Sequence, residues 1–257
     1  MSTRPGFPGK PIPATPSAPT RANVATSPRA QLVDATPSMA SAAVRARMVQ
    51  RLAALGVADQ RVLNAMNTVE RHRFVDSALM NQAYEDTSLP IGLGQTISKP
   101  NVVARMIELL LGAPALAGQP AGRLGRVMEI GTGCGYQATL LSHVATEVYT
   151  IERLRGLHER ARSNLRYFRL ATVHLLLGDG MLGYPKGAPY AGIIAAAGGD
   201  AIPQAWIDQL AVGGRIVAPT RSANGTQALV VIDKSASGVQ RSVLEAVHFV
   251  PLKSGIA

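Results

Sequence analysis

The sequence predicts a doubly wound α/β domain with a mostly parallel sheet, an N-terminal helical cap and a closing antiparallel strand pair. Three observations lead to this prediction. The chain of 257 residues is 47% apolar but only 4% aromatic, so Ala, Val, Leu, Ile and Met must form the core, as they do in parallel sheets. After residue 125, short β-type runs alternate with helical periodicity, which is typical of βαβ units. The last two runs have no helix between them.

Residues 1–40 are predicted to be disordered. Eight of the 17 prolines lie there, among Ser, Thr, Ala and Gly, with almost no large apolar side chains. Such a segment buries too little apolar surface to offset the entropy lost on ordering. The folded domain is therefore expected at residues 41–257.

Three helices are predicted before the sheet. From Ser41, apolar residues recur on one helical face until Gly56, a typical helix stop: Val44, Met48, Leu52 and Leu55. A second, short helix is expected at residues 59–69. A third begins with Pro100 in its first turn and ends at Gly112, with Val103, Met106 and Leu110 at helical spacing.

The sheet follows. Its expected strands are residues 126–130, 147–152, 173–179, 190–197, 214–220, 227–234 and 242–250. Helical segments are expected around residues 136–144, 154–168 and 203–210. The strands at 227–234 and 242–250 are the expected antiparallel pair.

Charge and cysteine content favour a protein of a reducing compartment, which we expect to be the cytoplasm. The formal charge is +10, but residues 1–51 carry seven Lys/Arg and one Asp, which leaves only +4 for the other 206 residues. No aromatic residues interleave with a basic stripe, so a nucleic-acid partner is not favoured. Neither a membrane span nor a signal peptide is evident. Cys134 is the only cysteine, and no Cys/His group has metal-ligand spacing.

A glycine-rich turn joins the first core strand to a helix in VMEIGTGCGY, residues 127–136. Gly131, Gly133 and Gly135 let the backbone approach a ligand, with N–H groups of the helix start facing it. The dinucleotide fingerprint requires glycine or alanine where Tyr136 stands. The turn therefore favours a nucleoside without phosphates on a Rossmann-like sheet. Cys134 has no His nearby in sequence and is interpreted as a packing residue.

Acidic residues follow the strands at matching points. Glu152 ends the second core strand, where a carboxylate can accept ribose hydroxyls. Asp179 follows the third and could meet an adenine amino group, and Glu129 lies near the amino-acid end of such a ligand. Each residue alone also fits a solvated strand end or a turn. Together they indicate a cationic ligand, and S-adenosylmethionine carries a sulfonium and an ammonium.

Four segments together resemble the protein-L-isoaspartate O-methyltransferases, from about Val44 to the C-terminus. They are VMEIGTGCGY, the GDG at 178–180, LPIGLGQTISKP at 89–100 and EAVHFVPL at 245–252. The resemblance implies methyl transfer from S-adenosylmethionine, which becomes S-adenosylhomocysteine, to the α-carboxyl of isoaspartyl residues in aged proteins. It implies no metal. It divides the domain into a helical cap and substrate segment at 41–99 and a cofactor-binding core at 100–257.

The resemblance also implies the site residues. Ser98 is the expected catalytic residue, and Thr96, Ser98, Val250, Pro251 and Leu252 are expected to bind substrate. The expected cofactor-binding residues are Glu129, Gly131, Thr132, Gly133, Gly135, Glu152, Asp179 and Gly180. A peptide carboxylate has a pKa near ~3.5 and needs hydrogen-bond donors and alignment, not a base.

Alternatives remain open from the residues themselves. Ser98 could instead cap the helix at Pro100, and residues 249–252 could be a closing core strand. The chain departs from the family pattern at Lys99, Ala191 and Gly198–Gly199. A methyltransferase for another acceptor, or a non-enzymatic binding protein on the same fold, are the rival functions. Isoaspartyl proteins and peptides are the expected partners of a monomeric chain.

Overall fold

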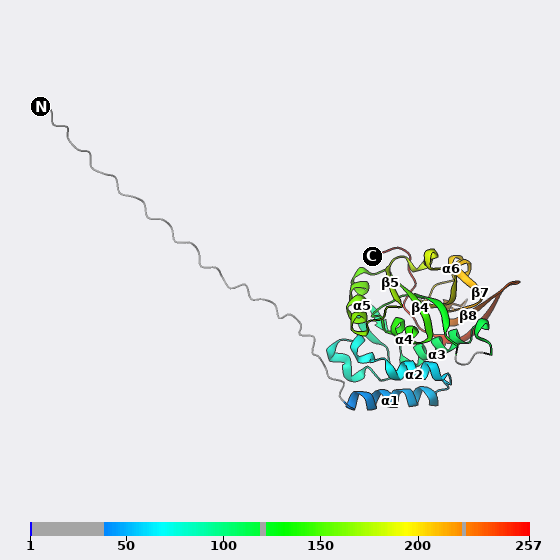
Figure 1. Ribbon diagram of the computed structural model, residues 1–257, viewed down its shortest axis with the longest axis horizontal. Coiled ribbons are helices and arrows are strands. Elements are labelled where there is room, and N and C mark those ends of the chain that lie inside the picture. Colours follow the sequence, from blue (N-terminus) through cyan, green and yellow to red (C-terminus); the bar gives the residue numbers. More distant parts are fainter. Residues whose placement is uncertain (2–38, 119–121, 223–224) are drawn as a thin grey trace. The chain divides into compact units, whose positions relative to one another are not determined.

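The computed structural model describes residue 1 and residues 39–118, 122–222 and 225–257 (Figure 1). The contacts of the chain separate Met1–Thr36 from Pro37–Ala257. All helices and strands described below belong to the second unit. The tail predicted at residues 1–40 lies almost wholly outside the described residues, and helix α1 begins at Met39.

Seven strands form one sheet in the order β5-β4-β3-β6-β7-β8-β9 (Figure 1). The first five in this order run parallel, and β8 and β9 add on antiparallel. Their bounds are β3 Leu124–Ile130, β4 Ala145–Glu152, β5 Val173–Leu177, β6 Tyr190–Ala195, β7 Leu210–Arg221, β8 Gln227–Ser235 and β9 Gly238–Val247. The predicted fold class, with its closing antiparallel pair, is confirmed.

Helices cover both faces of the sheet. Helix α3 (Pro100–Leu111) contacts β6 and β7, α4 (Tyr136–Val144) contacts β3 and β4, and α5 (Arg155–Phe168) contacts β4 and β5. Helix α2 (Gln60–Thr68) packs on α3 and α4, and α1 (Met39–Ala54) packs on α2. Helix α6 (Gln204–Gln209) packs against β7. Five one-turn helices complete the set: Arg71–Phe74, Ser77–Gln82, Pro114–Leu116, Gly180–Leu182 and Pro185–Gly187.

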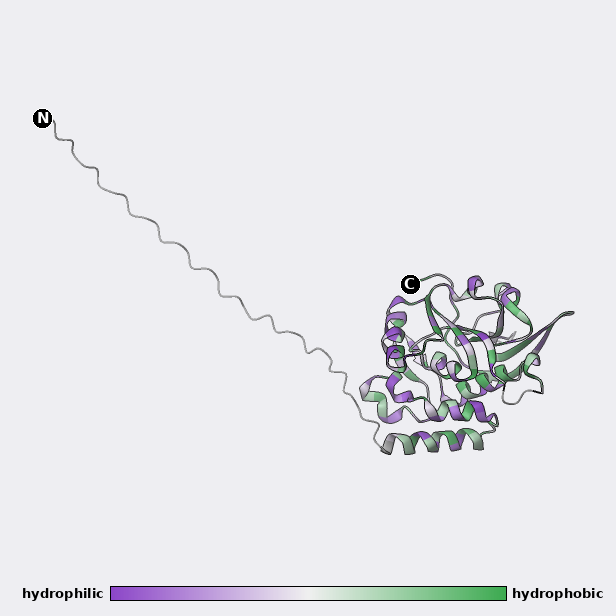
Figure 2. Ribbon diagram, in the orientation of Figure 1, coloured by the Kyte–Doolittle hydropathy of each residue, from purple (hydrophilic) through white to green (hydrophobic). Residues whose placement is uncertain are grey.

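Two hydrophobic cores lie on the two faces of the sheet. Adjacent residues of β6 divide between them: Ile194 belongs to the core under the helical cap, and Ile193 to the core around Trp206 of α6. This division explains why the parallel strands read as continuous apolar runs. Figure 2 shows hydrophobic residues along the central strands and many hydrophilic ones on α5.

Two local predictions are wrong, and the first concerns α1. There, Met48 and Leu52 are buried, but the outer members of the predicted face, Val44 and Leu55, are exposed. The structure also contains two strands that are not among those expected from the sequence: β1 (Leu89–Gly92) and β2 (Gln95–Ile97) form an antiparallel hairpin before α3.

The last strand ends at Val247, three residues earlier than predicted. Beyond Val247, the side chain of Gln227 makes the hydrogen bonds that the backbone of a neighbouring strand would otherwise make. The Gln227 amide accepts a hydrogen bond from Phe249 N at 2.7 Å and donates one to Phe249 O at 3.1 Å. The N–H and C=O groups of Phe249 are therefore both paired where the chain leaves the sheet.

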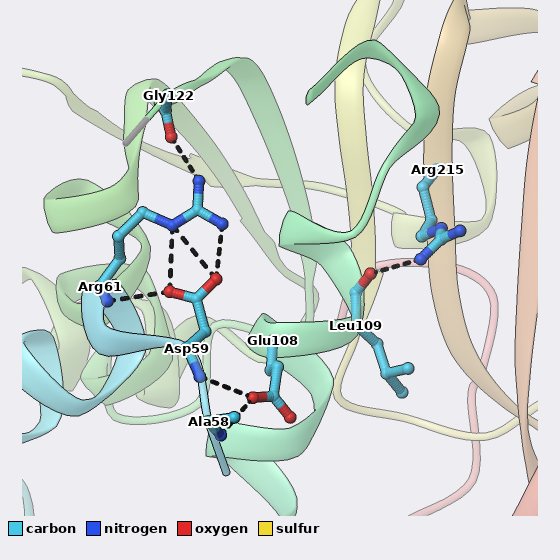
Figure 3. A network of polar contacts seen from close by, with 7 residues as sticks. All are labelled: Ala58, Asp59, Arg61, Glu108, Leu109, Gly122 and Arg215. Atoms are coloured by element: carbon cyan, nitrogen blue, oxygen red, sulfur yellow. Dashed lines mark hydrogen bonds and ion pairs between the residues drawn. The ribbon is translucent and has the colours of Figure 1, made fainter. Parts of the chain in front are cut away.

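A polar network joins the cap to the core (Figure 3). The Glu108 carboxylate of α3 accepts hydrogen bonds from the backbone N–H groups of Ala58 and Asp59, at 2.7 and 2.9 Å. Asp59 in turn caps α2 by accepting from Arg61 N at 2.8 Å. The Arg61 guanidinium donates to Gly122 O at 2.6 Å, next to β3. The network fixes where α2 begins relative to α3.

Replacing Glu108 with Ala should lower the free energy of unfolding by about 1–2 kcal/mol, because two charge-assisted hydrogen bonds are lost. Urea denaturation would measure this change. Glu245→Ala is the matched control, since Glu245 pairs with the same Arg105 at 3.2 Å but is 46% exposed. Its cost should stay below about 0.5 kcal/mol. Equal costs for the two variants would contradict a linking role for Glu108.

Candidate active site

The glycine-rich turn lies where β3 ends and α4 begins, at the carboxyl edge of the parallel strands. Gly131, Gly133 and Gly135 have φ of 88°, 57° and 90°, a region that side chains other than glycine rarely adopt. The backbone N–H groups of Gly131 and Thr132 both donate to Ile151 O of β4, at 2.9 and 3.3 Å. The turn is therefore held against the neighbouring strand. It lies beside the point where the chain order of the sheet reverses, at which open α/β sheets bind ligands.

Glu152 braces this turn from the end of β4. Its carboxylate accepts hydrogen bonds from Gly133 N and Leu154 N, both at 2.9 Å, and it is only 4% exposed. Each carboxylate oxygen has a second lone pair, so the group can still accept from a ligand hydroxyl.

Glu129 lies deeper, fully buried at the end of β3. Burial raises its pKa to about 8, against the lowering effect of the hydrogen bond from the Thr150 hydroxyl. One carboxylate oxygen accepts from Thr150 Oγ1 at 2.5 Å. The other oxygen, and the buried Gln137 Nε2, have no hydrogen-bond partner among the described residues. Buried polar atoms without partners are rare in folded proteins, so this pair indicates where a ligand with its own polar groups belongs.

A cavity of about 500 Å³ opens in front of the turn, which is a typical size for a small-molecule site. Ten of the predicted site residues line it: Thr96, Ser98, Gly131, Thr132, Gly133, Glu152, Gly180, Val250, Pro251 and Leu252. Glu129, Gly135 and Asp179 are not in its wall. Glu152 is the only carboxylate in the described wall, beside Arg153 and Lys253, so the wall is less acidic than the sequence indicated.

Asp179 binds backbone groups. One carboxylate oxygen accepts from Met181 N at 2.8 Å and so caps a one-turn helix, and the other accepts from Gly255 N at 2.7 Å. Its expected contact with a ligand remains a prediction. Gly180, next to it, lines the cavity, and a Cβ at this position would lie 2.5 Å from Ile130 Cγ2.

The hairpin β1–β2 carries Thr96 and leads into Ser98. Leu93 and Gly94, with φ of 52° and 69°, form its two-residue turn. Arg160 of α5 fixes the hairpin by donating to Ile91 O at 2.8 Å. The Ser98 hydroxyl has no described partner, and no side-chain hydrogen bond caps α3, whose N-cap residue is Lys99. The alternative that Ser98 serves as a helix cap is therefore wrong.

Arg71 is a residue of this site that the sequence did not reveal. Its side chain is fully buried and donates to Ala83 O and to Ser98 O, both at 2.8 Å. The guanidinium carbon lies 4.8 Å from the centre of the Tyr136 ring. Burial lowers the pKa of Arg71. The pattern of the sequence does not distinguish it from Arg73, which pairs with Glu70 in the same short segment.

Residues 250–252 also line the cavity. Gly198 N donates to Val250 O at 2.9 Å, and Leu252 N donates to Gly198 O at 2.8 Å. These two backbone groups therefore pair within the chain. A Cβ on Gly198 would lie 2.7 Å from Gln227 Nε2, so a side chain there would push the Gln227 amide away from Phe249.

The fold, the glycine-rich turn and the acidic strand ends define an S-adenosylmethionine-dependent methyltransferase. A sequence model described as Protein-L-isoaspartate(D-aspartate) O-methyltransferase (PCMT) matches residues 43–257. The chain belongs to this family, and the predicted family and enzyme class are confirmed.

Relatives and solved structures agree with this family. A protein-L-isoaspartate O-methyltransferase of Methylibium petroleiphilum is 62% identical over 214 residues, covering 82% of this chain and 78% of the relative. One of Ralstonia nicotianae is 55% identical, covering 84% and 70%. A solved protein-L-isoaspartate O-methyltransferase superposes with a TM-score of 0.73 at 26% identity, covering 82% of this chain and 67% of that one. A Plasmodium falciparum structure in complex with S-adenosyl-L-homocysteine shares the fold, with a TM-score of 0.68 at 22% identity and coverage of 81% and 98%.

Replacing Gly198 with Ala should lower the free energy of unfolding by about 1–3 kcal/mol, because the added methyl group displaces the Gln227 amide from Phe249. Thermal or urea unfolding would measure the loss. Gly125→Ala is the control, because a Cβ there meets Ala191 Cβ at an ordinary 3.4 Å. That variant should be as stable as the parent or slightly more stable. Equal stability of both variants would show that Gln227 moves without cost.

Proposed function

We propose that this chain transfers a methyl group from S-adenosylmethionine to the α-carboxyl of L-isoaspartyl residues in damaged proteins. The observation that carries the proposal is that Thr96 and Ser98 share one cavity with the glycine-rich turn and Glu152. Ser98 does not serve as the cap of α3, since its hydroxyl makes no capping hydrogen bond to that helix. The fold alone would support only the class of enzyme, a methyltransferase. The placement of Thr96 and Ser98 beside the glycine-rich turn supports a carboxylate as the acceptor.

The residues present fit the cofactor. The backbone of Gly131–Gly133 and the Glu152 carboxylate would hold its nucleoside, and Gln137 with Glu129 behind it would receive its charged amino-acid end. Bound there, the cofactor supplies an electrophilic methyl group on a sulfonium. Among the described residues, no group of three or more His, Cys, Asp or Glu side chains is arranged to hold a metal ion.

Ser98 and Thr96 act as donors to the acceptor. A peptide α-carboxylate is already ionised at neutral pH, so the site has to replace its water and aim it. The half-buried Ser98 hydroxyl is available for this, because the bond from Arg71 uses the Ser98 carbonyl and leaves the side chain unengaged. The side chains of Val250 and Leu252 shape the opposite wall. Proton removal by a base is not required.

The partners are isoaspartyl proteins and peptides, which we propose meet a monomeric chain in the cytoplasm. In the described part of the chain, none of the helices has the length and hydropathy of a membrane span. Cys134, the only cysteine, is buried, and burial raises the pKa of its thiol, which supports a packing role.

A matched pair of peptides tests the function. One carries isoaspartate and the other aspartate at the same position, and each is incubated with the chain and methyl-labelled cofactor. Label on the isoaspartyl peptide alone is the expected result. Cofactor binding with label on neither peptide would favour a different acceptor, and absence of cofactor binding would favour a non-enzymatic binding protein.

Ser98→Ala should lower kcat/KM for the isoaspartyl peptide about 10- to 100-fold, the equivalent of one hydrogen bond to a charged group. Cofactor affinity, measured by calorimetry, should stay unchanged, because the Arg71 bond to the Ser98 carbonyl remains. Ser163→Ala, at an exposed position of α5, is the control and should have normal kinetics. Loss of cofactor binding in Ser98→Ala, or a rate that depends on a deprotonation near neutral pH, would contradict the assigned role.

Cofactor binding at pH 7 should release a proton from Glu129. Its pKa of about 8 keeps most of the carboxyl protonated before binding. A cation bound beside it lowers that pKa below 7, so the proton leaves. Calorimetry in buffers of different ionisation enthalpy would measure up to about one proton. Glu129→Gln should bind without this release, and an equal release from both proteins would contradict the prediction.

A further inference from the structure

A second, smaller cavity adjoins the first. It measures about 330 Å³ and shares four lining residues with the larger cavity: Thr96, Ser98, Ala196 and Val250. Its other lining residues are Ser88, Lys99, Val102, Ala246, Val247, His248 and Phe249. Ser98, where the acceptor carboxylate is expected to bind, therefore lines both cavities. The larger cavity contains the glycine-rich turn, and the smaller one offers space beside Ser98 for the rest of an acceptor peptide.

The smaller cavity has a basic character that the catalytic reaction does not use. Lys99 and His248 are its two titratable residues, and its described lining contains no carboxylate. Lys99 directly follows Ser98 and is exposed. Its backbone carbonyl accepts from Val103 N at 3.1 Å, but its side chain makes no hydrogen bond or ion pair to the described residues and does not cap α3.

The carboxylates near this cavity have other partners. Glu245, on β9 and close in sequence to His248, pairs with Arg105 at 3.2 Å. Asp86, close in sequence to Ser88, accepts a hydrogen bond from Asn101 N at 2.8 Å. Within the described part of the chain, neither carboxylate forms an ion pair with Lys99.

We infer that the smaller cavity is a subsite for the acceptor residue next to the isoaspartate, and that Lys99 and His248 select an acidic side chain there. This inference rests on the proposed function. The isoaspartyl carboxylate occupies Ser98, and a second carboxylate one residue away reaches the Lys99 ammonium, with an N–H of His248 as a further donor. Lys99, which departs from the family pattern, thereby determines which damaged sites are repaired fastest.

The test uses isoaspartyl peptides with Glu, Gln or Lys on either side of the isoaspartate. With the unaltered chain, a Glu peptide should have a KM about two- to fivefold lower than its Gln twin, and a Lys peptide a higher one, as expected for a solvent-exposed ion pair. Lys99→Glu should reverse this order. His248→Gln should reduce the preference without reversing it.

A control variant separates local from general charge effects. Lys186→Glu makes the same change of charge at an exposed position outside both cavities, and it should keep the order of the unaltered chain. KM values that do not depend on the neighbouring charge, or an order that survives in Lys99→Glu, would overturn the inference. Failure to methylate any isoaspartyl peptide would instead overturn the proposed function, so the two failures are distinguishable.

Discussion

The candidate site depends on one buried cation. Arg71 forms no ion pair with a carboxylate of the described residues, and its guanidinium is stabilised by carbonyl groups and by the face of an aromatic ring. These carbonyls belong to Ala83 and Ser98, in segments that contain no long helix of their own. A buried charge tolerates little displacement of its partners. The irregular chain between α2 and α3 is thereby given a defined geometry at the residue where the reaction is expected.

Two carboxyl groups, those of Glu152 and Glu129, contribute to the site in different ways. Glu152 holds the glycine-rich turn by its own hydrogen bond, so the turn is set before any ligand arrives. Glu129 behaves differently, because full burial favours its neutral form until a cation is near. The two carboxyl groups thus differ in role: Glu152 fixes the turn, and Glu129 is the group whose protonation is expected to change when a cation binds. On the acceptor side, Ser98 is the proposed donor to the isoaspartyl carboxylate, and Lys99 lines the smaller cavity beside it.

Much of this arrangement could be predicted from the sequence because it follows from local rules. The alternation of strands and helices gives the sheet, and the glycines of residues 131–135 mark the turn. Ser98 is a candidate because the sequence resembles a family, and the match to the model of that family confirms the resemblance. What could not be predicted involves partners far apart in the chain. The bond of Arg71 to Ser98 spans 27 residues, and that of Asp179 to Gly255 spans 76. Neither leaves a periodic signal.

The exit of the chain from β9 has a consequence for how this protein can change during evolution. The Gln227 side chain acts as a substitute peptide group, donating and accepting in the places where a strand neighbour would do so. Glutamate has nearly the same shape but lacks the donor, so it is not equivalent here. A larger residue at Gly198 would displace this amide from Phe249 unless the residue at position 227 were shorter. The effects of substitutions at positions 198 and 227 should therefore depend on each other.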